Sequence, residues 1–262
     1  MSYEQKKYLR NIKIKKFFIL LIQIFILIFA LLIWQLLADK NIINSFITSS
    51  PKDIFKTIIN LYQKKNIFNH IYVTTYETII SFLLSSVIGI LIATILWWSK
   101  TLYKILDPYF TILNSLPKVA LGPIILIWCG ANIKSIILMA IFVSIIITII
   151  NVYQGFNNVD PNKIKLMNTF NAKKYQIFFK LIVPNSLKNI ISTLKISISM
   201  SLIGVIMGEF LVSKQGIGYL IMYGSQIFNL NLVMTGILLL CILATILYFI
   251  IDYLEKKLVK NN

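Results

Sequence analysis

The chain alternates between long apolar stretches and shorter segments rich in lysine. Six stretches come close to the roughly 20 residues that a helix needs to cross a bilayer, and they cover residues 17–38, 79–98, 108–128, 135–152, 190–212 and 232–251. Each is uniformly apolar and lacks the two-residue alternation of a lipid-facing β-strand. We therefore expect an all-α fold, a polytopic membrane bundle of about six transmembrane helices that forms a single domain over residues 17–262.

The third apolar stretch is interrupted by two prolines. Pro117 precedes Lys118, and a second proline follows Gly122, so the helical hydrogen bonds must break there. Broken backbone at membrane depth is tolerated only against protein or a water-filled cavity. Lys118 would then line a translocation path with Asn114 and Pro117 and guide an anion. The alternative is that Lys118 snorkels or pairs with a neighbouring carbonyl group.

The composition excludes a soluble domain. Hydrophobic residues make up 58% of the chain and charged residues 13%, whereas soluble proteins carry about 25% charged residues. The net charge of +17 is explained by basic residues that flank apolar spans and fix their orientation, so nucleic acid is not an expected partner. Cys129 and Cys241 lie far apart in apolar surroundings, which predicts neither a disulfide framework nor a metal site.

The lysines and arginines also predict the orientation of the chain. Segments 1–16, 99–107, 153–189 and 252–262 share one side of the predicted membrane and hold most of these residues. Because cytoplasmic loops carry the excess of positive charge, we expect both termini in the cytoplasm and a multi-pass location in the plasma (inner) membrane. The first apolar run is too long for a cleaved signal peptide and is expected to remain as a span.

The long outer connection contains a predicted amphipathic helix. Ile54, Ile58 and Tyr62 recur at helical spacing with polar residues between them. Ser50 is a candidate N-cap and Pro51 would occupy the first helical position. We expect this short helix to pack against the bundle on its outer face.

The inner connection over residues 153–189 is longer than a helical bundle needs. Asp160 followed by a proline predicts a helix start, and Asn171 lies where a residue in the left-handed conformation would end this helix. A second short helix over 172–182 is expected to end at Pro184. Two interpretations fit such a pair of helices: an interfacial pair resting on anionic lipid, or a docking element for a soluble partner.

A resemblance to a known family favours the docking element. The stretch KLMNTFNAKKYQIFFKLIVP (Lys165 to Pro184) is similar to the signature loop of ABC-importer permeases: Glu-Ala-Ala, three residues, Gly, nine residues, then Ile-x-Leu-Pro. The spacing is intact, and the proline is the identical residue. Three further stretches, SLPKVALGPIILIWCG, NNVDP and GEFLVSKQGIGYLI, resemble permeases of the nitrate/sulfonate/taurine type, so the resemblance covers residues 49–257.

The resemblance assigns the loop residues that would couple this chain to a separate ATPase. They are Lys165, Leu166, Met167, Phe170, Asn171, Ala172, Leu181 and Pro184. Lys165 stands where the family has an acidic residue, so contact with the ATPase is expected to depend on Leu166, Met167 and Phe170. Asn171 replaces the family's glycine, a mild change because asparagine tolerates the left-handed conformation well.

The resemblance implies a type I ABC-importer permease, a transport subunit rather than an enzyme. The chain contains no Walker A pattern, so we expect it to bind no cofactor, while ATP and Mg²⁺ are used by cytoplasmic ATPase subunits. Further expected partners are an extracytoplasmic solute-binding protein, a second permease copy in a homodimer, and membrane lipid. The solute would be a sulfonate-, nitrate- or taurine-like anion or a thiamine-precursor-like molecule.

Two other functions remain as alternatives. A secondary transporter would work without an ATPase, but the chain has no evident inverted repeat with paired broken helices. A membrane-embedded enzyme would need a cluster of His, Asp or Glu residues, and the sequence indicates none.

Polar residues within the spans complete the expected functional set, because ionisable groups are costly in a membrane. Glu209 precedes a loop that contains Gly216 and Gly218, and it resembles the family's acidic position before the outer gate, so we expect a role in gating. Lys195 is expected to snorkel towards the inner headgroups. His70 has no neighbour of metal-ligand type and is expected to be an ordinary surface histidine.

Overall fold

The computed structural model describes residues 3–64 and 66–259, and the regular structure in these ranges is entirely helical. A 3₁₀ turn at Lys118–Leu121 precedes α6, and a π-helical turn at Phe178–Ile182 precedes α10. The helices are α1 (Tyr3–Asp39), α2 (Ser45–Thr48), α3 (Pro51–Gln63), α4 (Ile67–Trp98), α5 (Lys100–Ser115), α6 (Gly122–Cys129), α7 (Ile133–Asn157), α8 (Pro161–Thr169), α9 (Lys174–Ile177), α10 (Val183–Val212), α11 (Ile217–Gln226) and α12 (Leu230–Val259).

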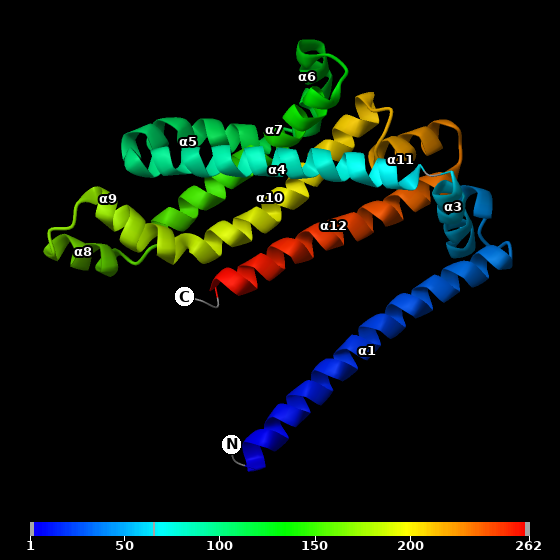
Figure 1. The fold of residues 1–262 in the computed structure, drawn as a ribbon, viewed down its shortest axis with the longest axis horizontal. Helices are drawn as coiled ribbons and strands as arrows, with labels where there is room; N and C mark the ends of the chain where they lie inside the picture. Colours follow the sequence, from blue (N-terminus) through cyan, green and yellow to red (C-terminus); the bar gives the residue numbers. More distant parts are fainter. Residues whose placement is uncertain (1–2, 65, 260–262) are drawn as a thin grey trace.

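Helices α4, α7 and α10 form the centre of the bundle, and α12 lies along α10 (Figure 1). Small residues allow α10 to approach α7 closely. A Cβ atom on Gly204 would lie 2.5 Å from the Cα of Ala140, and one on Gly208 would lie 3.0 Å from the Cα of Ile136. Such contacts between small residues are the usual way in which membrane helices gain packing energy.

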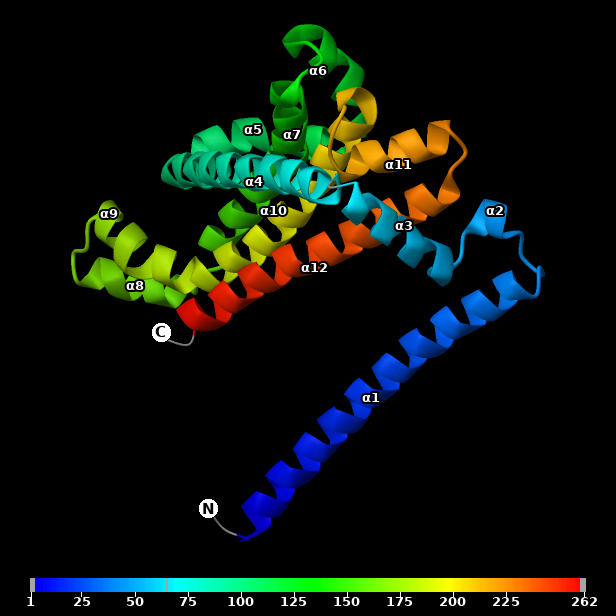
Figure 2. The ribbon, with the colours of Figure 1, turned by 45° about the vertical axis from the view of Figure 1, so that its right-hand side comes forward.

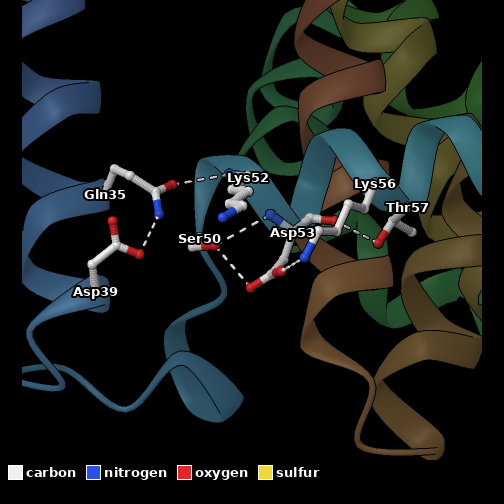
Figure 3. Close-up of polar contacts among 7 residues, drawn as sticks. All are labelled: Gln35, Asp39, Ser50, Lys52, Asp53, Lys56 and Thr57. Carbon is white, nitrogen blue, oxygen red and sulfur yellow. Dashed lines mark hydrogen bonds and ion pairs between the residues drawn. The ribbon is translucent and has the colours of Figure 1, made fainter.

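The first helix stands apart from this bundle (Figure 2). None of the most apolar part of α1 is buried. The end of α1 contacts α3, where the Lys52 backbone N–H donates a hydrogen bond of 3.0 Å to the Gln35 side chain (Figure 3). The predicted amphipathic helix is present as α3. Its Ser50 hydroxyl accepts a hydrogen bond from the Asp53 N–H, so the expected N-cap is confirmed.

The third predicted span, over residues 108–128, is wrong as a single helix. Helix α5 ends at Ser115, and the segment Lys118–Cys129 turns away from it by 89°. Leu116 adopts an extended conformation with ψ of 139°, as expected for a residue before proline. Residues 100–107, expected in an inner loop, are helical. By length and composition, five of the described helices are able to cross a membrane, or six if this bent pair is one span.

The remaining helices extend beyond the predicted apolar stretches. In the central bundle the start of α4 differs most, because it begins at Ile67 although the predicted span begins at residue 79. The extra turns contain Thr74 and Glu77, which are buried inside the protein. Because these polar side chains face other helices rather than lipid, hydropathy alone places the start of the helix too late.

The inner connection folds largely as expected, with one correction. The Asp160 side chain accepts a hydrogen bond from the Asn162 N–H at 2.8 Å, and Asn171 has a φ of 52°, so both expected helix ends are confirmed. Pro184, however, does not end the second helix. The π-turn lets the Val183 N–H bond to the Phe178 carbonyl, and the proline then occupies the first turn of α10, where its missing N–H costs little.

Candidate functional site

Helix α8 and the residue after its end present two different faces at the end of the bundle where α7 ends. Ile164 and Met167 pack into an apolar cluster with the buried side chains of Phe156 and Phe178. Leu166 lies on the other face and is 58% exposed, and Phe170 directly after the helix is 75% exposed. One face therefore fixes the helix to the bundle, and the other is free to contact a partner.

The end of α8 is closed by Asn171. The Asn171 N–H donates to the Asn168 carbonyl at 2.9 Å, and the Ala172 N–H donates to the Met167 carbonyl at 3.1 Å. This pair of bonds is a Schellman motif with asparagine in the left-handed position that usually holds glycine. The turn of the chain at Asn171 holds the exposed Phe170 beside the end of α8.

The segment after Asn171 is anchored to the C-terminal end of α4. The Lys174 ammonium donates to the Trp98 carbonyl at 2.5 Å and lies 5.6 Å and 5.8 Å from the ring centres of Trp97 and Trp98. The Phe178 ring packs against both tryptophans. The segment then continues through the buried Ile182 into α10, so α8 is connected to a long membrane helix without a flexible linker.

The broken span brings together the three residues expected there. The Lys118 ammonium donates to the Asn114 side-chain oxygen at 3.2 Å and to the Asn114 backbone carbonyl at 3.4 Å. The carbonyl is available because α5 ends at Ser115 and Pro117, three residues after Asn114, has no N–H to donate to it. Lys118 thus pairs with a neighbouring carbonyl group, which is the second of the two expectations for this residue.

Glu209 occupies the junction between α10 and α11. It is 1% exposed. Its carboxylate accepts hydrogen bonds from the Thr74 hydroxyl at 2.6 Å and from the Gly218 N–H at 2.5 Å. A Cβ atom on Gly216 would lie 2.3 Å from the Glu209 Cδ. The two expected glycines therefore allow the start of α11 to close around this carboxylate.

Sequence reasoning missed two hydrogen-bonding partners of this junction, His70 and Thr74, which both lie on α4. The expectation of a surface histidine at position 70 is wrong, because His70 is buried and its Nδ1 accepts the Gly216 N–H at 3.0 Å. Glu77 is buried on the same face of α4. The signal for this face was the spacing of His70, Thr74 and Glu77, which places all three on one side of a helix.

The expected snorkelling of Lys195 is also wrong. Its ammonium lies 2.5 Å from the Asp252 carboxylate and forms a second ion pair with Glu255. Both acidic residues belong to the end of α12, which runs beside α10. Because packing supplies these carboxylates, Lys195 finds its counter-charge within the protein instead of at a lipid headgroup.

Comparison with known proteins relates this architecture to transport systems. Residues 85–260 match the family described as "Binding-protein-dependent transport system inner membrane component". The chain is 27% identical over 228 residues to the putative aliphatic sulfonates transport permease protein SsuC of Bacillus subtilis, which covers 87% of this chain and 83% of that protein. It is 28% identical over 189 residues to the formylaminopyrimidine transport permease protein ThiX of Halalkalibacterium halodurans, covering 72% of this chain and 75% of that protein.

The fold also resembles a solved structure. A chain of the MetNI methionine ABC transporter in an inward-facing conformation superposes with a TM-score of 0.64 and 17% sequence identity. The match covers 76% of this chain and 97% of that chain.

Proposed function

Because this chain belongs to the family of binding-protein-dependent transport system inner membrane components, we propose that it forms the alternating-access path of an ATP-driven importer. Its fold is that of a type I ABC-importer permease, and the relatives named above are transport permeases rather than enzymes. The observation that carries the proposal is the exposed pair Leu166 and Phe170, held at the inner surface on a segment that packs continuously into α10.

A separate ATPase binds this pair. Burial of a large apolar side chain contributes about 1.5–3 kcal/mol, so Leu166 and Phe170 together supply a substantial anchor in a groove of the partner. Lys165 is exposed beside them, and an acidic group on the ATPase would complement its charge. Met167 faces the bundle, so its role is to receive the movement of the ATPase rather than to touch it.

Closure of the ATPase reaches the spans through packed side chains. The cluster that holds Met167 also contains Phe178 and Ile182, and the π-turn leads from them directly into α10. At the start of α10, the Ser186 hydroxyl donates to the Gly155 carbonyl at 3.0 Å, which ties α10 to α7. A shift of α8 therefore moves both central helices, and the bundle acts as a two-state element that nucleotide and solute bias.

The broken span forms part of the solute path. Asn114 is exposed and Lys118 half-buried, and such groups are costly against lipid. A second copy of this chain covers them, and the polar surface between the copies guides the solute delivered by an extracytoplasmic binding protein. The positive charge of Lys118 favours a small anion of the sulfonate class, in keeping with the named relative from Bacillus subtilis; a thiamine-precursor-like molecule is the other candidate.

Reconstitution separates this function from a secondary transporter. The tagged chain, purified from its own host, is expected to bring down an ATP-hydrolysing subunit, and proteoliposomes with both subunits and the binding protein should accumulate solute only when ATP is present. Uphill uptake into vesicles that contain this chain alone would overturn the proposal and establish secondary transport.

A further inference from the structure

A cavity of about 790 Å³ lies where the C-terminal end of α4 meets α8 and α9 (Figure 1). Its apolar lining includes Trp98, Phe156, Ile164 and Ile177. Cavities of this volume that combine apolar and aromatic side chains with a few polar groups are typical binding sites for small organic molecules. This cavity is therefore large enough, and apolar enough, to hold part of an amphipathic molecule.

The polar part of the lining is positively charged. It includes Lys100 at the start of α5 and Lys174 at the start of α9. None of the described residues that line the cavity is acidic, and neither lysine forms an ion pair with any other part of the described chain. The cavity thus carries two positive charges without a counter-charge of its own, which favours an anionic ligand.

Lys174 is held in position at the edge of this cavity. Its ammonium donates to the Trp98 carbonyl and lies over the rings of Trp97 and Trp98. An ammonium group has three donor hydrogens, so two of them remain free to bind an anion. Because these contacts already restrict the side chain, little conformational freedom is lost when an anion binds.

The two tryptophans indicate that the cavity lies at the level of lipid headgroups. Trp97 and Trp98 end α4, which is long and apolar enough to cross a membrane, and tryptophan is enriched where a membrane meets water. Basic pockets between membrane helices at this level bind the headgroups of anionic lipids. A phosphodiester group fits the charged part of the lining, and the apolar part accommodates the glycerol and the first carbons of the acyl chains.

We propose that this cavity binds the headgroup of an anionic phospholipid, with the phosphate between Lys100 and Lys174 and the glycerol against the apolar lining. The bound headgroup joins the start of α5 to the segment after α8. The site is separate from the proposed ATPase contact, because Ile164 in the cavity lining belongs to the bundle face of α8, whereas Leu166 and Phe170 are exposed. It goes beyond the proposed transport role and does not depend on it.

Lipid titration of the full chain in detergent, followed by native mass spectrometry, tests the proposal. Phosphatidylglycerol should bind more tightly than phosphatidylcholine with the same acyl chains, because both lipids contain a phosphate but only the first has a net negative charge. Lys100→Gln, at an exposed residue whose loss should not disturb the fold, should weaken phosphatidylglycerol binding about fivefold, and adding Lys174→Gln should weaken it by about tenfold or more. The control pair Lys163→Gln and Lys180→Gln, two exposed lysines outside the cavity lining, should keep the wild-type affinity.

Two results of the titration would overturn the proposal: equal affinity for the two lipids, or the same loss of affinity in the control pair. Competition separates a lipid site from a site for a soluble anion. Inorganic phosphate in large molar excess should not displace phosphatidylglycerol, because contacts with the apolar lining also contribute to lipid binding. Displacement would show that the cavity takes a soluble anion and would refute the lipid assignment.

Tryptophan fluorescence locates the bound lipid. In a chain with Trp34→Phe and Trp128→Phe, the remaining tryptophans are those at the cavity, Trp97 and Trp98. Phosphatidylglycerol with brominated acyl chains should quench them more strongly than brominated phosphatidylcholine, and adding Lys100→Gln should reduce this difference. Equal quenching by the two lipids would contradict the site. Neither readout requires an ATPase or a solute, so failure here is distinct from failure of the transport role.

Discussion

At the scale of single residues, Asn171 decides how α8 ends. Its φ of 52° costs about 1–2 kcal/mol for most side chains and least for glycine and asparagine. We expect Asn171→Gly to leave ATP-driven uptake intact and Asn171→Val to reduce it several-fold, because a β-branched residue opposes the left-handed turn. Uptake into proteoliposomes measures the effect. Equal activity of the two variants would contradict the role assigned to this turn.

Gly216 is the second residue whose identity is dictated by its surroundings. It has a φ of 108°, and a Cβ atom there would meet the Glu209 carboxylate at 2.3 Å. Gly216→Ala is therefore expected to lower the unfolding free energy by about 2–4 kcal/mol, from overpacking together with backbone strain. Thermal unfolding of the purified chain measures the loss.

The same substitution made in a Glu209→Ala chain separates the contributions of overpacking and backbone strain to this loss of stability. In a Glu209→Ala chain the clashing atoms are absent, so adding Gly216→Ala should cost less than in the wild type, with the backbone strain as the remainder. Strictly additive losses would show that the carboxylate does not confine this glycine.

At the scale of elements, the two faces of α8 predict different defects. Phe170→Asp removes an exposed apolar anchor, so ATPase co-purification should be lost while the unfolding temperature of the chain stays unchanged. Met167→Asp places an unpaired charge in the cluster with Phe178, and it should lower the unfolding temperature by several degrees. Phe46→Ala, at an exposed phenylalanine of α2, is the control that should alter neither property. Loss of stability in Phe170→Asp would contradict the outward face.

Packing between elements also explains why some helices depart from their predicted limits. The prolines at 117 and 184 have equal intrinsic effects on a helix, yet the first produces an 89° bend and the second lies inside a continuous helical segment. The difference is the π-turn before Pro184, which shifts the hydrogen bonds by one residue. That shift is set by the packing of Phe178 and Ile182 in their cluster, which the local sequence does not specify.

At the scale of the whole molecule, α1 is an appendage to the bundle. Its most apolar part buries nothing against the rest of the described chain. Deletion of residues 1–34 retains Gln35 and its hydrogen bond to Lys52, so the remaining helices should keep the unfolding temperature of the full chain. Thermal unfolding and far-ultraviolet circular dichroism in the same detergent measure this. A large loss of cooperative unfolding would show that α1 supports the bundle after all.

The sequence by itself determined the features that depend on near neighbours and on composition. Apolar length predicted the membrane helices, and Asp160 and Asn171 predicted both ends of α8, because a cap is made by groups within a few residues of one another. The spacing of the coupling loop and the stretches around it predicted the family, which the comparisons confirm over residues 85–260. The roles of Lys118 and of the loop residues in transport stay predictions.

Only the tertiary structure decided the interior polar contacts. His70 meets Gly216 across 146 residues of chain, Thr74 meets Glu209 across 135, and Lys195 meets Asp252 across 57. Each of these residues taken alone is compatible with an exposed or snorkelling position. Their pairing depends on which helix faces are packed together, and that choice results from the close approach of α4, α7, α10 and α12 as a whole rather than from any local pattern.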